Sequence, residues 1–201
     1  MLVYERARER SSDVVTSSPR HHVTPTMSNP LSRVWFTPTR GASNWLWLSF
    51  FVVIFDQATK ALVIGTVKMQ DAIELLPILD IVYLENTGAA FSILAQAGGW
   101  QRWFFITLAL VVSVTLMVWL RRIRAEQILL AVGLSLILGG ALGNVIDRVM
   151  HGYVVDFIYF HWKQHYFPAF NIADTAISIG AGCLLLDAFL ESGHKKEASS
   201  V

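Results

Sequence analysis

Four apolar stretches, each close to the length that crosses a bilayer, constrain the fold of this chain more than any other feature. They cover residues 45–64, 103–120, 128–146 and 170–190. A helix needs about 20 mostly apolar residues to span the hydrocarbon core of a membrane. Only 15% of the 201 residues are charged, whereas soluble domains carry about 25%. We therefore predict an all-α membrane protein with four transmembrane helices.

Basic residues near the ends of these spans predict their orientation. The short segment between the second and third spans contains Arg121, Arg122 and Arg124, and both termini carry Lys or Arg near the spans. Because such segments tend to stay in the cytoplasm, we expect both termini inside and the other two loops on the periplasmic side. The net charge of +1 gives no reason to expect a nucleic-acid partner.

The chain divides into three expected regions. Residues 1–43 are rich in Arg, Ser, Thr and Pro without an apolar run, which is typical of a disordered tail and not of a signal peptide. Residues 44–191 hold the four spans, and residues 192–201 form a second cytoplasmic tail. Met27 is a candidate for an alternative start of translation.

The two outer loops contain short β-rich runs. Residues 78–84 and 153–160 are rich in β-branched and aromatic side chains, which favours strands. The following residues 85–88 (ENTG) are expected to end the first strand. Pairing of the two strands would provide hydrogen-bond partners for backbone N–H and C=O groups close to lipid.

Polar side chains gather at the outer ends of the spans. Asp56 and Lys60 are four residues apart in the first span, so they share a helix face and can form an ion pair that orients helices. Charged groups at membrane depth are costly, and they indicate a functional site. The other members of this cluster are Asn144, Asp147, Arg148, Asp156, Asn171 and Asp174.

Asp156 and Asp174 are the strongest candidates for chemistry. Two carboxyls that share a site cannot both ionise easily, so one can serve as an acid and the other as a base in peptide-bond hydrolysis. The structural alternative makes Asp174 a charge stabilised by a helix N-terminus and Asp156 an ordinary loop carboxylate. The apolar neighbours Val155 and Phe157 argue against free solvation of Asp156, and we favour catalysis.

Metal and cofactor sites are not expected. None of the six histidines has the spacing of a zinc site, and no Gly-rich phosphate loop follows a strand. Gly139, Gly140 and Gly143 lie inside the third span, where small residues let helices approach closely.

Five segments in order along the chain resemble one family. They are residues 56–60 (DQATK), 86–91 (NTGAAF), 139–148 (GGALGNVIDR), 154–157 (VVDF) and 170–174 (FNIAD). Together they resemble the bacterial lipoprotein signal peptidase, or signal peptidase II, over most of the chain beyond the N-terminal tail.

This resemblance implies an inner-membrane aspartic peptidase that cleaves diacylglyceryl-modified prolipoproteins before the lipidated cysteine. It implies that Asp156 and Asp174 are the catalytic pair, and Asp174 is the expected base because it lies nearer a helix N-terminus. We expect no cofactor, a monomer, and only prolipoprotein and membrane lipid as partners. The residues expected to bind substrate or support the site are Asp56, Lys60, Asn86, Gly88, Asn144, Asp147, Arg148 and Asn171.

Two other classes of protein remain open on the residues alone. An ion- or proton-coupled transporter would place ionisable groups near the midplane and often contains repeats. A non-enzymatic scaffold or lipid-binding assembly factor would tolerate conservative changes at Asp156 and Asp174.

Overall fold

The computed structural model describes residues 42–69, 71–88 and 98–198. The expected disordered tail over residues 1–43 lies outside this part of the chain, except for Ala42 and Ser43. Residues 89–91 of the NTGAAF segment and residues 199–201 also lie outside it.

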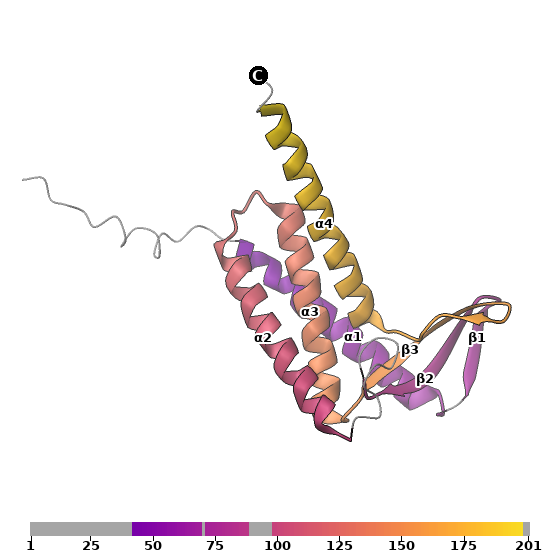
Figure 1. Cartoon of the computed structure of the whole chain (residues 1–201). Helices are drawn as coiled ribbons and strands as arrows, with labels where there is room; N and C mark the ends of the chain where they lie inside the picture. Colours follow the sequence, from indigo (N-terminus) through magenta and orange to yellow (C-terminus); the bar gives the residue numbers. More distant parts are fainter. Residues whose placement is uncertain (1–41, 70, 89–97, 199–201) are drawn as a thin grey trace, which may run out of the picture. The chain divides into compact units, whose positions relative to one another are not determined.

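Four long helices dominate the described residues (Figure 1). They are α1 (Leu46–Thr66), α2 (Trp100–Arg122), α3 (Ile128–Met150) and α4 (Ile172–Ala198), and a short 3₁₀ helix, η2 (Ala42–Trp45), precedes α1. All four are long and apolar enough to cross a membrane, which confirms the predicted number of spans. The apolar part of α4, Ile172–Ser192, agrees closely with the span predicted over residues 170–190. Most residues after position 190 are good helix formers, and the helix continues through the expected start of the C-terminal tail.

Helix α3 is the centre of the bundle. It packs against each of the other three long helices. Of its apolar 18-residue stretch, 61% is buried, compared with 17–28% of the corresponding stretches of the other three helices. Leu116 and Leu120 of α2 share one buried cluster with Leu134 and Leu138 of α3. The outer faces of α1, α2 and α4 are left apolar and exposed, as is expected of helices that contact lipid.

Glycines on α3 permit close contact with two neighbouring helices. A Cβ atom added at Gly139 would lie 2.8 Å from the carbonyl oxygen of Ser49 on α1. One added at Gly140 would clash with the carbonyl oxygen of Ala173 on α4. The predicted role of these small residues in helix packing is therefore confirmed.

A four-stranded antiparallel sheet connects to one end of the bundle. Its strands are β1 (Ala72–Leu76), β2 (Leu79–Asn86), β3 (Val154–Trp162) and β4 (His165–Tyr166), in that order across the sheet. The predicted pairing of the two β-rich runs is confirmed by the β2–β3 ladder. The all-α description is therefore only partly correct, because β1 and β4 were too short to recognise from composition.

The expected end of the first strand was wrong by two residues. Glu85 and Asn86 belong to β2, where they pair with Val155 and Val154 of β3. Pairing with a neighbouring strand overrides the weak strand preference of Glu and Asn. This extension brings the Asn86 side chain next to Asp156 on β3.

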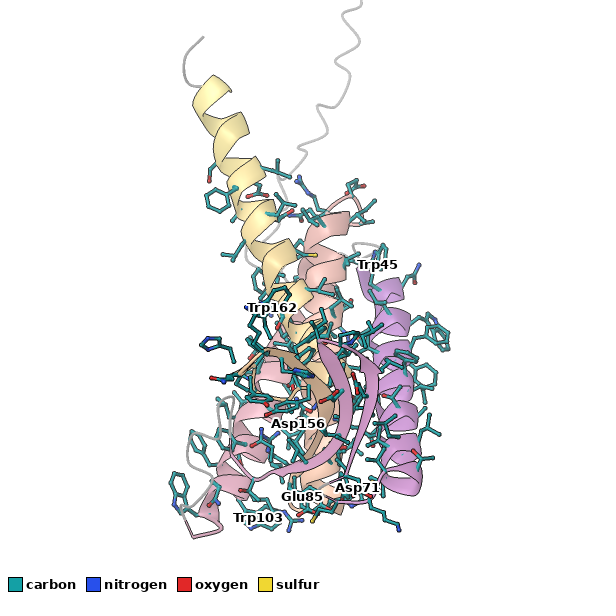
Figure 2. The ribbon with its side chains drawn as sticks, turned by 90° about the vertical axis from the view of Figure 1, so that its right-hand side faces the viewer. Trp45, Asp71, Glu85, Trp103, Asp156 and Trp162 are labelled. Carbon is teal, nitrogen blue, oxygen red and sulfur yellow. The ribbon has the colours of Figure 1, made fainter. Side chains whose placement is uncertain are left out.

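The sheet lies at the end of the bundle where α1 and α3 finish and α2 and α4 begin, and we call this the sheet end. Glu85 and Trp103 lie at the sheet end, and Trp45 lies at the opposite end (Figure 2). Asp156 lies between these two levels.

Replacement of Gly140 by Ala tests the packing of α3 on α4. The added methyl group must displace the backbone of Ala173, so we expect a loss of about 1–3 kcal/mol of stability, the usual range for overpacking. Thermal unfolding in detergent measures it. Gly182→Ala is the matched control because no atom lies within 4 Å of its added Cβ, and equal stability of the two variants would contradict this packing.

Candidate active site

A buried ion network lies between α1 and α3. The Lys60 ammonium lies 2.9 Å from Asp56 Oδ2 and 2.8 Å from Asp147 Oδ2. Exposed fractions of 0–2% show that all three residues are removed from solvent, and such charges are costly unless they are paired. The expected pair of Asp56 with Lys60 is present. Asp147 pairs with Lys60 and not with the adjacent Arg148.

The same network holds the backbone beside both candidate aspartates. Asp56 Oδ1 accepts a hydrogen bond from the Ala173 N–H at 2.9 Å, and Asp147 Oδ2 accepts one from the Val155 N–H at 3.1 Å. These two amides immediately precede Asp174 and Asp156 in the chain. The ion network therefore fixes the segments that carry the two carboxyls.

Asp174 takes part in the N-terminal cap of α4. Its backbone N–H donates to Asn171 Oδ1 at 2.9 Å, and its carboxylate Oδ2 accepts from the Asn171 N–H at 3.3 Å. This reciprocal arrangement is a capping box. Asn144 Nδ2 also donates to Asp174 Oδ1 at 2.9 Å. The helix N-terminus and these donors stabilise a negative charge on Asp174.

Asp156 is more deeply buried, with 4% of its surface exposed. Its two carboxyl oxygens accept hydrogen bonds from Asn86 Nδ2 at 2.9 Å and Asn171 Nδ2 at 2.8 Å. Burial, followed by repulsion from Asp174, raises the pKa of Asp156 to about 7, against the opposing effects of the two amides and Lys60. The two carboxyls thus occupy different electrostatic environments.

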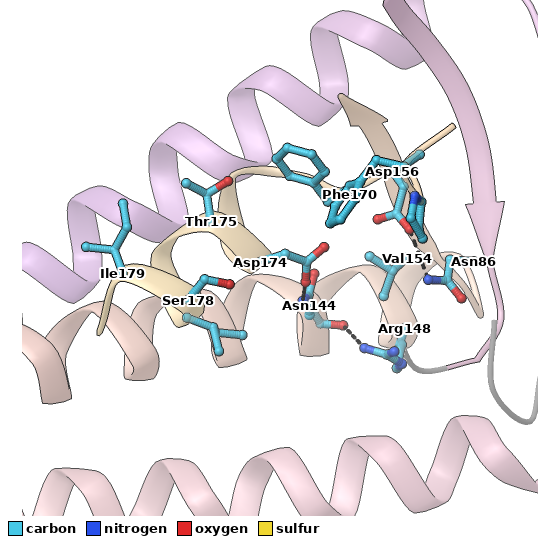
Figure 3. A pocket seen from close by; sticks show the side chains of 14 residues that line it. Asn86, Asn144, Arg148, Val154, Asp156, Phe170, Asp174, Thr175, Ser178 and Ile179 are labelled. Carbon is cyan, nitrogen blue, oxygen red and sulfur yellow. Dashed lines mark hydrogen bonds between the residues drawn. The ribbon is translucent and has the colours of Figure 1, made fainter. Parts of the chain in front are cut away.

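Both carboxyls line one cavity of about 530 Å³ (Figure 3). Its other polar side chains are those of Asn86, Asn144, Arg148, Thr175 and Ser178. Its apolar walls come from the segment that leads into α4 and from the first turns of α4. The apolar members of this wall are Phe167, Pro168, Ala169, Phe170, Ile177 and Ile179.

Arg148 connects α3 to the end of β2. Its Nη2 donates to the Gly88 carbonyl oxygen at 2.8 Å, and its guanidinium lies over the Phe105 ring at 5.1 Å. Gly88 therefore contributes a carbonyl oxygen that fixes Arg148 at the cavity. In the part of the chain that the structure describes, no group of three or more His, Cys, Asp or Glu could hold a metal ion.

The structure brings the ten predicted site residues into one connected region, and it adds others. Gln57 was missed, although its Nε2 donates to Asp147 Oδ1 at 2.8 Å and lies 3.2 Å from Asp56 Oδ2. Its position inside the DQATK segment was the available signal. Ser178 was also missed, and its four-residue spacing from Asp174 places it on the same face of α4.

Four membrane-length helices and two carboxyls in one cavity define a multi-pass membrane protein with a candidate acid–base site. Comparison with known proteins gives the family. The model of the family described as signal peptidase (SPase) II matches residues 48–190, so this chain belongs to the signal peptidase II family. The family and the apolar helices together indicate a peptidase of the bacterial inner membrane.

Individual relatives agree with this assignment. The chain is 53% identical over 161 residues to the lipoprotein signal peptidase of Ectopseudomonas mendocina, covering 79% of this chain and 95% of that one. It is 49% identical over 154 residues to that of Alteromonas mediterranea, covering 77% and 85%. A solved bacterial membrane enzyme superimposes with a TM-score of 0.69 at 36% identity, covering 77% of this chain and 92% of that chain.

Replacement of Lys60 by Met tests the ion network. It leaves two buried carboxylates without their cation, so we expect a loss of about 3–5 kcal/mol of folding stability. Denaturant unfolding in detergent measures this change. Lys68→Met is the control because Lys68 is exposed near the end of α1. Similar stability of the two variants would show that the Lys60 ammonium does not hold the site together.

Proposed function

We propose that this chain is an aspartic endopeptidase that removes signal peptides from diacylglyceryl-modified prolipoproteins, cleaving before the lipidated cysteine. The observation that carries the proposal is the convergence of Asp156 and Asp174 in one cavity, each held by asparagine amides. Membership of the signal peptidase II family supports the substrate class.

In the proposed mechanism, Asp174 is ionised and Asp156 is protonated when substrate binds. Asp174 removes a proton from a water molecule as the water oxygen attacks the scissile carbonyl carbon, and Asp156 donates its proton to the carbonyl oxygen. Asp174 then gives its proton to the leaving cysteine nitrogen, and Asp156 recovers a proton from the intermediate as the C–N bond breaks. The capping box at Asp174 and the raised pKa of Asp156 support these roles.

We further propose that the sheet end faces the periplasm and that both termini are cytoplasmic. Arg121 and Arg122 lie in the last turn of α2, at the opposite end of the bundle, and Arg124 follows the helix, in agreement with the positive-inside rule. In this orientation the acyl chains of the substrate can stay in lipid while the scissile bond reaches the polar end of the cavity. A monomer with residues 44–191 as its catalytic domain is sufficient for this mechanism.

Replacement of either carboxyl by its amide tests the pair. Asp156→Asn and Asp174→Asn should each reduce cleavage by at least about 10²–10⁴-fold, the usual contribution of an acid–base group, without loss of folded protein. Cleavage of a diacylated prolipoprotein by the purified protein measures this. Asp80→Asn is the control because the Asp80 carboxyl contacts His161 on the sheet and does not line the cavity. Near-normal turnover of either site variant would refute the two-aspartate mechanism.

The pH profile tests the assignment of Asp156 as the acid. A protonated acid with a pKa of about 7 is lost as pH rises, so cleavage should decline above about that pH. The Asn86 amide stabilises the ionised form and lowers this pKa. Asn86→Ala should therefore raise the pKa further and move the alkaline limb to higher pH. An alkaline limb that stays in place or moves to lower pH would exclude Asp156 as its source.

A further inference from the structure

Ser178 places a hydroxyl group in a part of the cavity where the only other polar side chain that lines it, Thr175, already donates its hydroxyl to the Asn171 carbonyl oxygen. It lies one helical turn after Asp174 on α4, and the Asp174 and Ser178 side chains both line the cavity (Figure 3). Four residues of helix correspond to a rise of about 6 Å, directed away from the sheet end. The adjacent residues Ile177 and Ile179 also line this region. Their side chains offer no hydrogen-bond partner to the Ser178 hydroxyl.

The Ser178 hydroxyl is available for a ligand. It is exposed, and among the residues that the structure describes its Oγ has no hydrogen-bond partner. Several other hydroxyls on these helices are already occupied, because they donate to the carbonyl oxygen four residues earlier. These are Thr59, Thr66, Thr115 and Thr175.

The chemistry of this region fits an ester carbonyl better than a peptide. An acyl ester brings one strong acceptor flanked by hydrocarbon and no donor, which matches a single hydroxyl between isoleucines. A peptide segment would bring N–H groups as well, and a buried N–H without a partner is costly. Peptide groups instead match the amide and guanidinium donors near Asp156, at the polar end of the cavity.

We propose that Ser178 donates a hydrogen bond to an ester carbonyl of the diacylglyceryl group on the substrate cysteine. The glycerol is attached through the cysteine side chain, so its esters are only a few bonds from the scissile amide. A carbonyl held one turn from Asp174 fixes the lipidated cysteine relative to both carboxyls. This inference rests on the proposed function and adds to it a protein group that recognises the lipid ester itself.

The test compares two synthetic prolipopeptides that differ only in the lipid linkage. One carries a diacylglyceryl cysteine, and the other carries the dialkyl ether analogue, which lacks both carbonyls. Ser178→Ala should lower kcat/KM for the ester substrate by about 2- to 10-fold, the range expected for one hydrogen bond. It should leave kcat/KM for the ether substrate almost unchanged, and Ser178→Thr, which keeps the hydroxyl, should restore the preference for the ester.

Thr175→Val is the matched control, because the Thr175 hydroxyl already donates to Asn171. Any loss in this variant should be equal for the two substrates. An equal loss for both substrates in Ser178→Ala, or no loss for either, would overturn the assignment of the ester contact. If the proposed function were wrong, the result would be distinguishable, because the wild-type protein would then cleave neither the ester nor the ether substrate.

Discussion

The rest of the site depends on the two ion pairs that the Lys60 ammonium forms with the carboxylates of Asp56 and Asp147. One cation offsets much of the cost of burying two carboxylates. The second oxygen of Asp56, Oδ1, accepts a hydrogen bond from the Ala173 N–H, and Asp147 Oδ2, which also contacts Lys60, accepts one from the Val155 N–H. The ion network therefore joins α1 and α3 to the start of α4 and to β3. The network positions Asp174 and Asp156 by holding the backbone of the residue that precedes each of them. This positioning does not depend on the side chains that line the cavity.

A second constraint distinguishes the two carboxyls. Asp174 lies in the first turn of α4, where the helix N-terminus favours a negative charge. Asp156 lies on a buried strand, where burial favours the neutral form and its pKa is raised to about 7. We propose that this difference assigns the base and the acid. Under this proposal the acid lies on strand β3 and the base at the start of α4, and both line one cavity.

The sequence predicts those elements that depend on residues close together in the chain. Hydropathy predicts the four spans, and the topology then places the polar residues at one end of the bundle. Except for Asp56 and Lys60, which are four residues apart, the partners inside this cluster were not predictable, because they are far apart in the chain. The contact between Asp56 and Ala173 joins residues 117 positions apart, and no local pattern indicates that Asp147 pairs with Lys60. Strands β1 and β4 were missed since a strand of two to five residues gives little periodicity to recognise.

The assignment of Asp156 as the acid and Asp174 as the base is tested most directly by the protonation of the two carboxyls in the resting protein. Infrared spectroscopy of protein with ¹³C-labelled aspartate can detect a protonated carboxyl, and comparison with Asp156→Asn assigns its band. We expect one protonated carboxyl band below about pH 7 that belongs to Asp156 and disappears as pH rises through that value. The absence of this band from the spectrum of Asp156→Asn would assign it to Asp156. A spectrum in which Asp156 is already ionised at pH values well below about 7, or in which the protonated band belongs to Asp174, would contradict the proposed division of roles.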